Sequence, residues 1–291
     1  MASTNLDAAI GRRRMVFIGA HPDDETFGIG GTLATYARQG VEVYIVCATR
    51  GEVGEIADPS LATPETLAYV RELELRCACG TLRIEQPTFL GYRDSGMAGD
   101  PQNDDPRSLA RASAQTVTGQ LVAWLRRVRP QVVITFEPGG GYGHPDHVAI
   151  SRHATAAFAA ASDPARFPEA GLAYQPRKLY HTALPRQMFR DMLARLTAAG
   201  ITLDMGSMDL ENRGMPDDKV TTVIDVSGVI DTKMAAFQCH RTQLGQGSFF
   251  SRVPPEIMRA VMSREYFACV SPGPQEGCGF GGETDLFADV D

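Results

Sequence analysis

Two short polar segments of this 291-residue sequence carry side chains that bind metal ions and move protons. Residues 21–24 read His-Pro-Asp-Asp, and residues 144–147 read His-Pro-Asp-His. In each segment the first and fourth residues are three apart, so one helical turn would place both side chains on the same side. Imidazole and carboxylate groups are ligands of Zn²⁺, and the two segments together hold three of the six histidines. We therefore interpret them as one metal site rather than as two helix caps.

The number of polar groups in these segments suits a hydrolytic zinc site. Such a site needs about three protein ligands and a further position for water. Two ligands from one segment and one from the other would leave a carboxylate and an imidazole unused. The carboxylate could take a proton from the activated water, whose pKa zinc lowers from ~15.7 towards ~7. The imidazole could stabilise an oxyanion and protonate a leaving amine. Spacing alone leaves open whether His144 or His147 binds the metal.

A buried strand is predicted shortly before each polar segment, with residues 137–143 between the second strand and its segment. Residues 15–18 and 132–136 are short apolar runs, which are typical of strands buried on both faces. In open α/β sheets, ligands bind beyond the carboxyl ends of the strands. We therefore expect the two segments to meet at one sheet edge, together with residues 49–52, which follow a further predicted strand at residues 41–48.

The remaining pattern predicts an α/β fold, with a Rossmann-like, mostly parallel sheet, helices on both faces and a C-terminal elaboration. Further strands are expected at residues 88–91, 179–184, 220–226 and 266–270. Helices are expected at residues 26–39, 64–79, 106–129, 145–161, 185–199, 231–242 and 256–262. We expect residues 1–175 to form the catalytic core with the metal site, and residues 176–291 to complete the pocket within the same domain.

Composition limits the class of protein and its partners. A net charge of -7 without a concentrated basic face argues against nucleic acid. No apolar run approaches the ~20 residues of a membrane span, and none suits a signal peptide, so we expect a cytoplasmic protein without a membrane partner. Six cysteines are too few for a disulfide scaffold in a chain of this length and are expected to be reduced packing residues: Cys47, Cys77, Cys79, Cys239, Cys269 and Cys278.

Several other residues have a structural as well as a functional interpretation. The glycines of residues 28–31 could indicate a dinucleotide-binding turn, but three acids precede them where pyrophosphate would lie. We expect these glycines to allow close packing of a helix on the sheet. His153, His181 and His240 are expected in the core or at the surface, away from the strand ends. Tyr142, within a glycine run, is either a loop aromatic or a mobile hydroxyl donor.

The polar segments also carry a family resemblance. Residues 20–25 (Ala-His-Pro-Asp-Asp-Glu), 30–32 (Gly-Gly-Thr) and 143–147 (Gly-His-Pro-Asp-His) resemble the PIG-L/LmbE-like zinc-dependent N-deacetylases, which act on N-acetylglucosaminyl compounds. Residues 71–74, 92–97, 214–217 and 233–243 are similar to the mycothiol-pathway members of this family, the deacetylase and the conjugate amidase.

The resemblance implies a role for each residue of the two motifs. His21, Asp24 and His147 would hold zinc. Asp23 would be the general base, and His144 would stabilise the oxyanion and act as the acid.

Five further residues receive roles from the same resemblance. Asp146 would orient and charge the imidazole that acts as the acid, and Tyr142 would contact the oxyanion. Arg71 and Asp94 would bind sugar hydroxyls, with Glu52 nearby in the pocket; the structural alternative for Arg71 and Asp94 is a surface ion pair.

The expected function is hydrolysis, by metal-activated water, of the N-acetyl group of a small molecule that contains N-acetylglucosamine. The cofactor would be Zn²⁺, although nitrogen and oxygen ligands also admit other divalent ions such as Fe²⁺. An amidase acting on a larger amino-sugar thiol conjugate is the near alternative, and a non-catalytic nucleotide-binding module is the distant one, because nucleotide phosphate would face the acids of residues 23–25. The partner would be a small amino-sugar substrate, and the chain could form a homo-oligomer.

Overall fold

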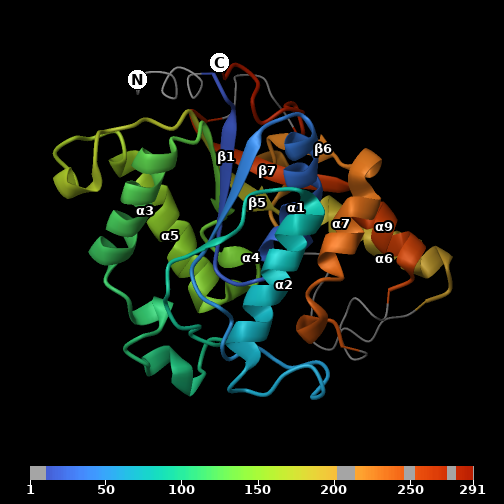
Figure 1. The fold of residues 1–291 in the computed structure, drawn as a ribbon. Coiled ribbons are helices and arrows are strands. Elements are labelled where there is room, and N and C mark those ends of the chain that lie inside the picture. Colours follow the sequence, from blue (N-terminus) through green and yellow to red (C-terminus); the bar gives the residue numbers. More distant parts are fainter. Residues whose placement is uncertain (1–10, 202–213, 246–252, 274–279, 291) are drawn as a thin grey trace, which may run out of the picture.

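The computed structural model describes residues 11–201, 214–245, 253–273 and 280–290. A mixed sheet lies at its centre (Figure 1). Its seven strands lie in the order β3-β2-β1-β4-β5-β7-β6. The strands are β1 (Arg14–Gly19), β2 (Glu42–Cys47), β3 (Thr88–Phe89), β4 (Val132–Phe136), β5 (Lys178–Ala183), β6 (Thr222–Asp225) and β7 (Arg264–Ser271). The first five pair in parallel, whereas β7 is antiparallel to both β5 and β6. The prediction of a Rossmann-like, mostly parallel sheet is therefore confirmed.

Helices cover both faces of this sheet (Figure 1). The α-helices of the described residues that bear on the argument are α1 (Asp24–Arg38), α2 (Leu67–Leu82), α3 (Ala114–Val128), α4 (Gly140–Gly143), α5 (Pro145–Ala160), α6 (Arg186–Ala198), α7 (Ile230–Phe237) and α9 (Pro255–Val261). Side chains alternate between the two faces of a strand. Met15 and Phe17 of β1 therefore join the core under α1, α2 and α7, while Val16 and Ile18 join the core under α3 and α5.

A glycine on α1 allows close approach of the C-terminal part of the chain. A Cβ atom on Gly31 would lie 2.5 Å from the Cβ of Val226, which is closer than real side chains come. This contact agrees with the packing interpretation of the glycines in residues 28–31. It gives them a structural reason that needs no bound nucleotide.

Most predicted elements are present within a few residues of their expected ends, but one helix is interrupted. Instead of a helix over residues 106–129, the chain forms a 3₁₀ turn at Leu109–Arg111, and α3 begins at Ala114. The amide of Leu109 donates to the carbonyl of Arg93, and the amide of Ala110 donates to the Ser95 hydroxyl. These tertiary hydrogen bonds replace the helical ones.

The expectation that all cysteines are reduced is wrong for two of them. Cys77 and Cys239 form a disulfide across 162 residues of sequence. The physical reason is that α2 packs against α7, which places the end of α7 beside Cys77. Cys47, Cys79 and Cys269 are free, and Cys278 lies outside the described residues.

None of the helices in the described ranges is both long enough and apolar enough to cross a membrane.

Candidate metal centre and catalytic pocket

The two polar segments lie beyond the carboxyl ends of neighbouring parallel strands. β1 pairs with β4, and one of the two segments follows each strand, directly after β1 and after a short loop beyond β4. After β1, the chain turns through His21 into α1. After β4, a glycine-rich loop leads to His144, which is the N-cap of α5 and whose Nδ1 accepts a hydrogen bond from the Asp146 amide at 3.1 Å. The sheet topology therefore brings together residues separated by more than 120 positions.

Three side chains of these segments have the spacing of metal ligands. His21 Nδ1 lies 3.2 Å from His147 Nε2, which in turn lies 3.3 Å from Asp24 Oδ1. Bonds of about 2.1 Å in a tetrahedral site separate two ligand atoms by about 3.4 Å. The contacts of His147 with His21 and with Asp24 therefore suit ligands of a zinc-like ion. Among the described residues, two groups have ligand atoms that all lie within 4.8 Å of one another: His21 with His144 and His147, and His21 with Asp94, His144 and Asp146.

Hydrogen bonds fix the orientation of Asp24 and His147. Asp24 Oδ2 accepts from the amides of Ala20 and His21, both at 2.8 Å, which leaves Oδ1 facing His147. His147 Nδ1 donates to the carbonyl of Gly140 at 3.1 Å. This bond leaves the Nε2 lone pair available for a metal, as is usual for histidine ligands.

The electrostatics of the cluster favour a cation. Burial lowers the pKa of His21, but the carboxylates of Asp146, Asp94 and Asp24 outweigh burial and raise that pKa to about 10. Burial would raise the pKa of Asp24, but His147 and His21 hold it well below its usual range. A site that stabilises an extra proton on a buried imidazole would also stabilise a divalent cation in its place.

Asp146 is fully buried and contacts both histidines of the cluster differently. Its Oδ2 lies 3.2 Å from His21 Nε2, so the carboxylate that was predicted to orient His144 contacts His21 instead, and only the backbone amide of Asp146 hydrogen-bonds His144. The amide and hydroxyl of Ser95 both donate to the Asp146 carboxylate. Sequence reasoning did not single out Ser95, although it lies in one of the segments that carry the family resemblance. Asp94 Oδ1 lies 3.5 Å from His21 Nε2 and 3.9 Å from His144 Nε2.

Asp23 lies beside the donors in an unusual backbone conformation, with φ of 128°. Its Oδ2 is 3.1 Å from Arg71 Nη2. Burial raises the pKa of Asp23, against the opposing effect of the Arg71 guanidinium. Arg71 is buried and also donates to the carbonyls of Pro22 and Gly51, at 2.6 and 3.2 Å. The alternative that Arg71 forms a surface ion pair with Asp94 is therefore wrong.

Two further predicted residues lie at the same edge. Glu52 Oε2 accepts from the backbone amide of Asp94 at 3.0 Å, so Glu52 supports the loop that carries Asp94. Burial would raise the pKa of Asp94, but His21 and the Gly96 amide hold it well below its usual range. Burial and the neighbouring His21 lower the pKa of His144 to about 4.

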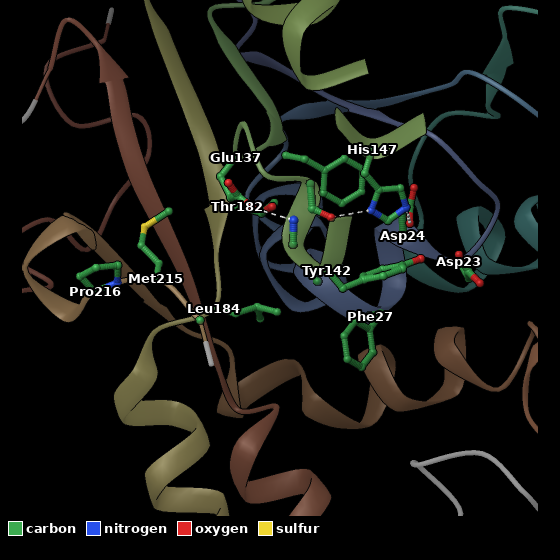
Figure 2. A pocket seen from close by; sticks show the side chains of 15 residues that line it. Asp23, Asp24, Phe27, Glu137, Tyr142, His147, Thr182, Leu184, Met215 and Pro216 are labelled. Carbon is green, nitrogen blue, oxygen red and sulfur yellow. Dashed lines mark hydrogen bonds and ion pairs between the residues drawn. The ribbon is translucent and has the colours of Figure 1, made fainter. Parts of the chain in front are cut away.

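A pocket of about 650 Å³ opens above the donors (Figure 2). Asp24 and His147 lie side by side near one end of the view, and Leu184, Met215 and Pro216 lie toward the other. Its lining consists of Asp23, Asp24, Phe27, Gly28, Phe136, Glu137, Gly140, Gly141, Tyr142, His147, Thr182, Leu184, Gly214, Met215 and Pro216. The half-exposed ring of Tyr142 is 5.0 Å from that of His147, and partial burial raises its pKa, so the phenol keeps its proton.

Three histidines lie outside the two polar segments, and one of them contacts the catalytic turn. His153 and His181 are buried, burial lowers the pKa of each, and neither lines the pocket. The expectation that His240 lies away from the strand ends is wrong, because its Nε2 is 2.7 Å from Glu25 Oε1, and Glu25 also accepts from the Asp23 amide. Burial would lower the pKa of His240, but Glu25 outweighs burial and raises it. The packing of α7 against α1 and α2 produces this contact, which no local sequence pattern indicates.

The sheet and its polar centre define an α/β protein with a cluster of histidines and aspartates at the strand ends that could hold a metal ion. The chain belongs to the PIG-L family, whose sequence model, described as GlcNAc-PI de-N-acetylase, matches residues 16–158.

Relatives with assigned names match nearly the whole chain. A 1D-myo-inositol 2-acetamido-2-deoxy-alpha-D-glucopyranoside deacetylase of Thermobifida fusca is 40% identical over 288 residues, which cover 95% of this chain and 99% of the relative. A protein of the same name, numbered 1, from Frankia casuarinae is 38% identical over 308 residues, with 100% and 99% covered. The N,N'-diacetylchitobiose deacetylase of Pyrococcus horikoshii shares the fold, with a TM-score of 0.64, 20% identity, and coverage of 89% of this chain and 84% of that chain.

Proposed function

We propose that the protein is a metal-dependent N-deacetylase that removes the acetyl group from a 2-acetamido-2-deoxyglucoside of inositol. The observation that carries the proposal is the contact of His147 with both His21 and Asp24, next to an open pocket that Asp24 and His147 line. The substrate follows from relatives that carry this activity in their names and match the chain over almost its full length.

The metal would be Zn²⁺ or another divalent ion such as Fe²⁺, held by His21, Asp24 and His147. When bound, it would supply a Lewis acid that activates water and polarises the acetyl carbonyl. The spacing of the three donor atoms and the hydrogen bonds that orient them support this ligand set.

The chain itself would supply the proton transfers. Asp23 would accept the proton that water loses as its oxygen attacks the acetyl carbon. Because His144 Nδ1 accepts a backbone hydrogen bond, the proton of its neutral ring is on Nε2, which can donate to the developing oxyanion. Tyr142 would donate its phenolic hydrogen to the same oxygen. The carbon–nitrogen bond then breaks as His144 Nε2 passes its proton to the sugar nitrogen. His144 regains a proton from Asp23, which returns to a carboxylate, and acetate and the amine leave.

Asp146 and the substrate contacts complete the proposal. The Asp146 carboxylate would keep the imidazole cluster oriented through His21, and its amide would hold His144. Asp94 and Arg71 would face the sugar hydroxyls, with Glu52 acting through the Asp94 amide.

A substrate comparison tests the proposal against the amidase alternative. Purified protein is supplied with the acetylated glucosaminyl inositol, with a bulky thiol conjugate of the deacetylated sugar, and with N-acetylglucosamine alone, and the freed amine is measured. We expect the inositol glycoside to give the highest kcat/KM. Faster cleavage of the thiol conjugate would replace deacetylase with amidase as the main activity.

The nucleotide-binding alternative has its own test. Calorimetric titration with dinucleotides is expected to give no binding heat, because the acids of residues 23–25 would repel phosphate and the glycine contact with Val226 has a packing purpose. Tight dinucleotide binding would contradict the proposed function.

A further inference from the structure

We infer that Glu25 and His240 are positioning residues that hold Asp23, the proposed general base, in its working orientation. This inference rests on the proposed function. It concerns two residues that do not line the pocket, and it gives the C-terminal part of the chain a role beside the catalytic turn.

The backbone of Asp23 needs such support. Its φ of 128° and ψ of -27° are outside the regions that L-residues ordinarily adopt. A residue held this way costs about 1–3 kcal/mol and persists only where the surrounding contacts fix it. The Asp23 amide donates to Glu25 Oε2 at 3.0 Å, and the Asp23 carbonyl accepts from the Thr26 hydroxyl at 3.0 Å. Glu25 therefore fixes the amide side of the strained residue.

Glu25 depends in turn on His240. The second carboxylate oxygen, Oε1, is 2.7 Å from His240 Nε2, and the two side chains are 1% and 0% exposed. A buried carboxylate without a partner is strongly destabilised, so Glu25 keeps this orientation only while a donor occupies the place of Nε2. Glu25 thus links the His240 side chain to the Asp23 backbone amide, with one carboxylate oxygen on each.

The segment that carries His240 is held on α2 by its neighbours in the sequence. The amide and hydroxyl of Thr242 donate to the two oxygens of Glu74, at 2.7 and 2.6 Å, and Cys239 is bonded to Cys77. The same helix carries Arg71, which contacts the Asp23 side chain. The backbone and the carboxylate of Asp23 are therefore both positioned from α2, the backbone through His240 and Glu25, and the carboxylate through Arg71.

Loss of the contact between Glu25 and His240 should lower kcat more than it changes KM or metal binding. Relaxation of Asp23 to an ordinary φ would move its carboxylate, and displacement of a reacting group by about 1 Å can cost about 10²-fold in rate. We expect His240→Ala to lower kcat about 10-fold to 100-fold. KM and the number of metal ions per chain should stay within about twofold, because no substrate contact or metal donor changes.

A conservative variant and a matched control distinguish positioning from simple stability. His240→Gln can place an N–H near the position of Nε2 and should restore kcat to within a few-fold. Lys233→Met removes a comparably buried pair, Lys233–Glu265, at 2.7 Å and with 2% and 1% exposure. This control should lower the melting temperature without changing kcat per folded molecule.

Crystal structures supply a readout that is independent of activity. In His240→Ala, the φ of Asp23 is expected to leave the value of 128°, and in His240→Gln it should be retained. Should His240→Ala fail to fold, Glu25→Ala takes its place, because it removes both carboxylate oxygens and with them the contacts to the Asp23 amide and to His240. Unchanged kcat and unchanged φ in the variant would overturn the inference. An inactive wild-type protein that binds metal would instead refute the proposed function.

Discussion

Replacement of Asp23 by asparagine separates the proposed base from the metal site. Asparagine keeps the size of the side chain and tolerates positive φ better than most residues, which matters at 128°. Its amide oxygen can still accept from Arg71 Nη2, which is 3.1 Å from Asp23 Oδ2 in the wild-type protein. The variant therefore loses chiefly the ability to accept a proton.

The size of the effect follows from that loss. General-base catalysis contributes about 10²–10⁴-fold, so kcat should fall by that factor, equivalent to about 3–5 kcal/mol in the activation free energy. The atoms with metal-ligand spacing belong to His21, Asp24 and His147, so metal content should be unchanged. The assay combines the rate of amine release at saturating substrate with elemental analysis of the same sample. A variant with wild-type kcat would refute the assignment of the base, and a variant without metal would make Asp23 a ligand.

Three further predictions concern stability and are checked by denaturant unfolding. Gly31→Ala should cost about 1–3 kcal/mol, because the new methyl group overlaps Val226; an unchanged free energy of unfolding would contradict the packing role. Replacement of both Cys77 and Cys239 by serine should cost about 2–5 kcal/mol, because the disulfide closes a long loop, and equal stability would contradict this. Burial lowers the pKa of His181 below its unfolded value, so the unfolded chain binds more protons and the free energy of unfolding should fall as pH drops from 7 through 6.5. His181→Asn should weaken this pH dependence. An identical pH profile in the variant would contradict the role of His181.

Much of the site could be predicted because its polar residues lie in short contiguous segments of the sequence. Each polar segment follows an apolar run within a few residues, and the parallel pairing of β1 with β4 places both segments at one edge. The contacts of His21 with His147 and of His147 with Asp24 thus follow from strand order and motif spacing.

The parts that sequence reasoning missed depend on packing between distant elements. The contact between Glu25 and His240 spans 215 residues, and the disulfide of Cys77 spans 162. Neither has a periodic signal, since both result from α7 packing against α1 and α2. The interrupted helix has the same origin, because Ser95 binds the Ala110 amide from another segment and local helix propensity does not register that competition.

Metal content tests the central claim most directly. The wild-type protein, His147→Ala and His153→Ala are purified and analysed for bound divalent ions before and after chelation. His153 is a buried histidine of α5 that does not line the pocket, and its variant serves as the matched control. We expect about one ion per chain in the wild-type protein and in His153→Ala, almost none in His147→Ala, and activity that disappears on chelation and returns with Zn²⁺. Equal metal content in all three proteins, or full activity after the ion is removed, would contradict the account.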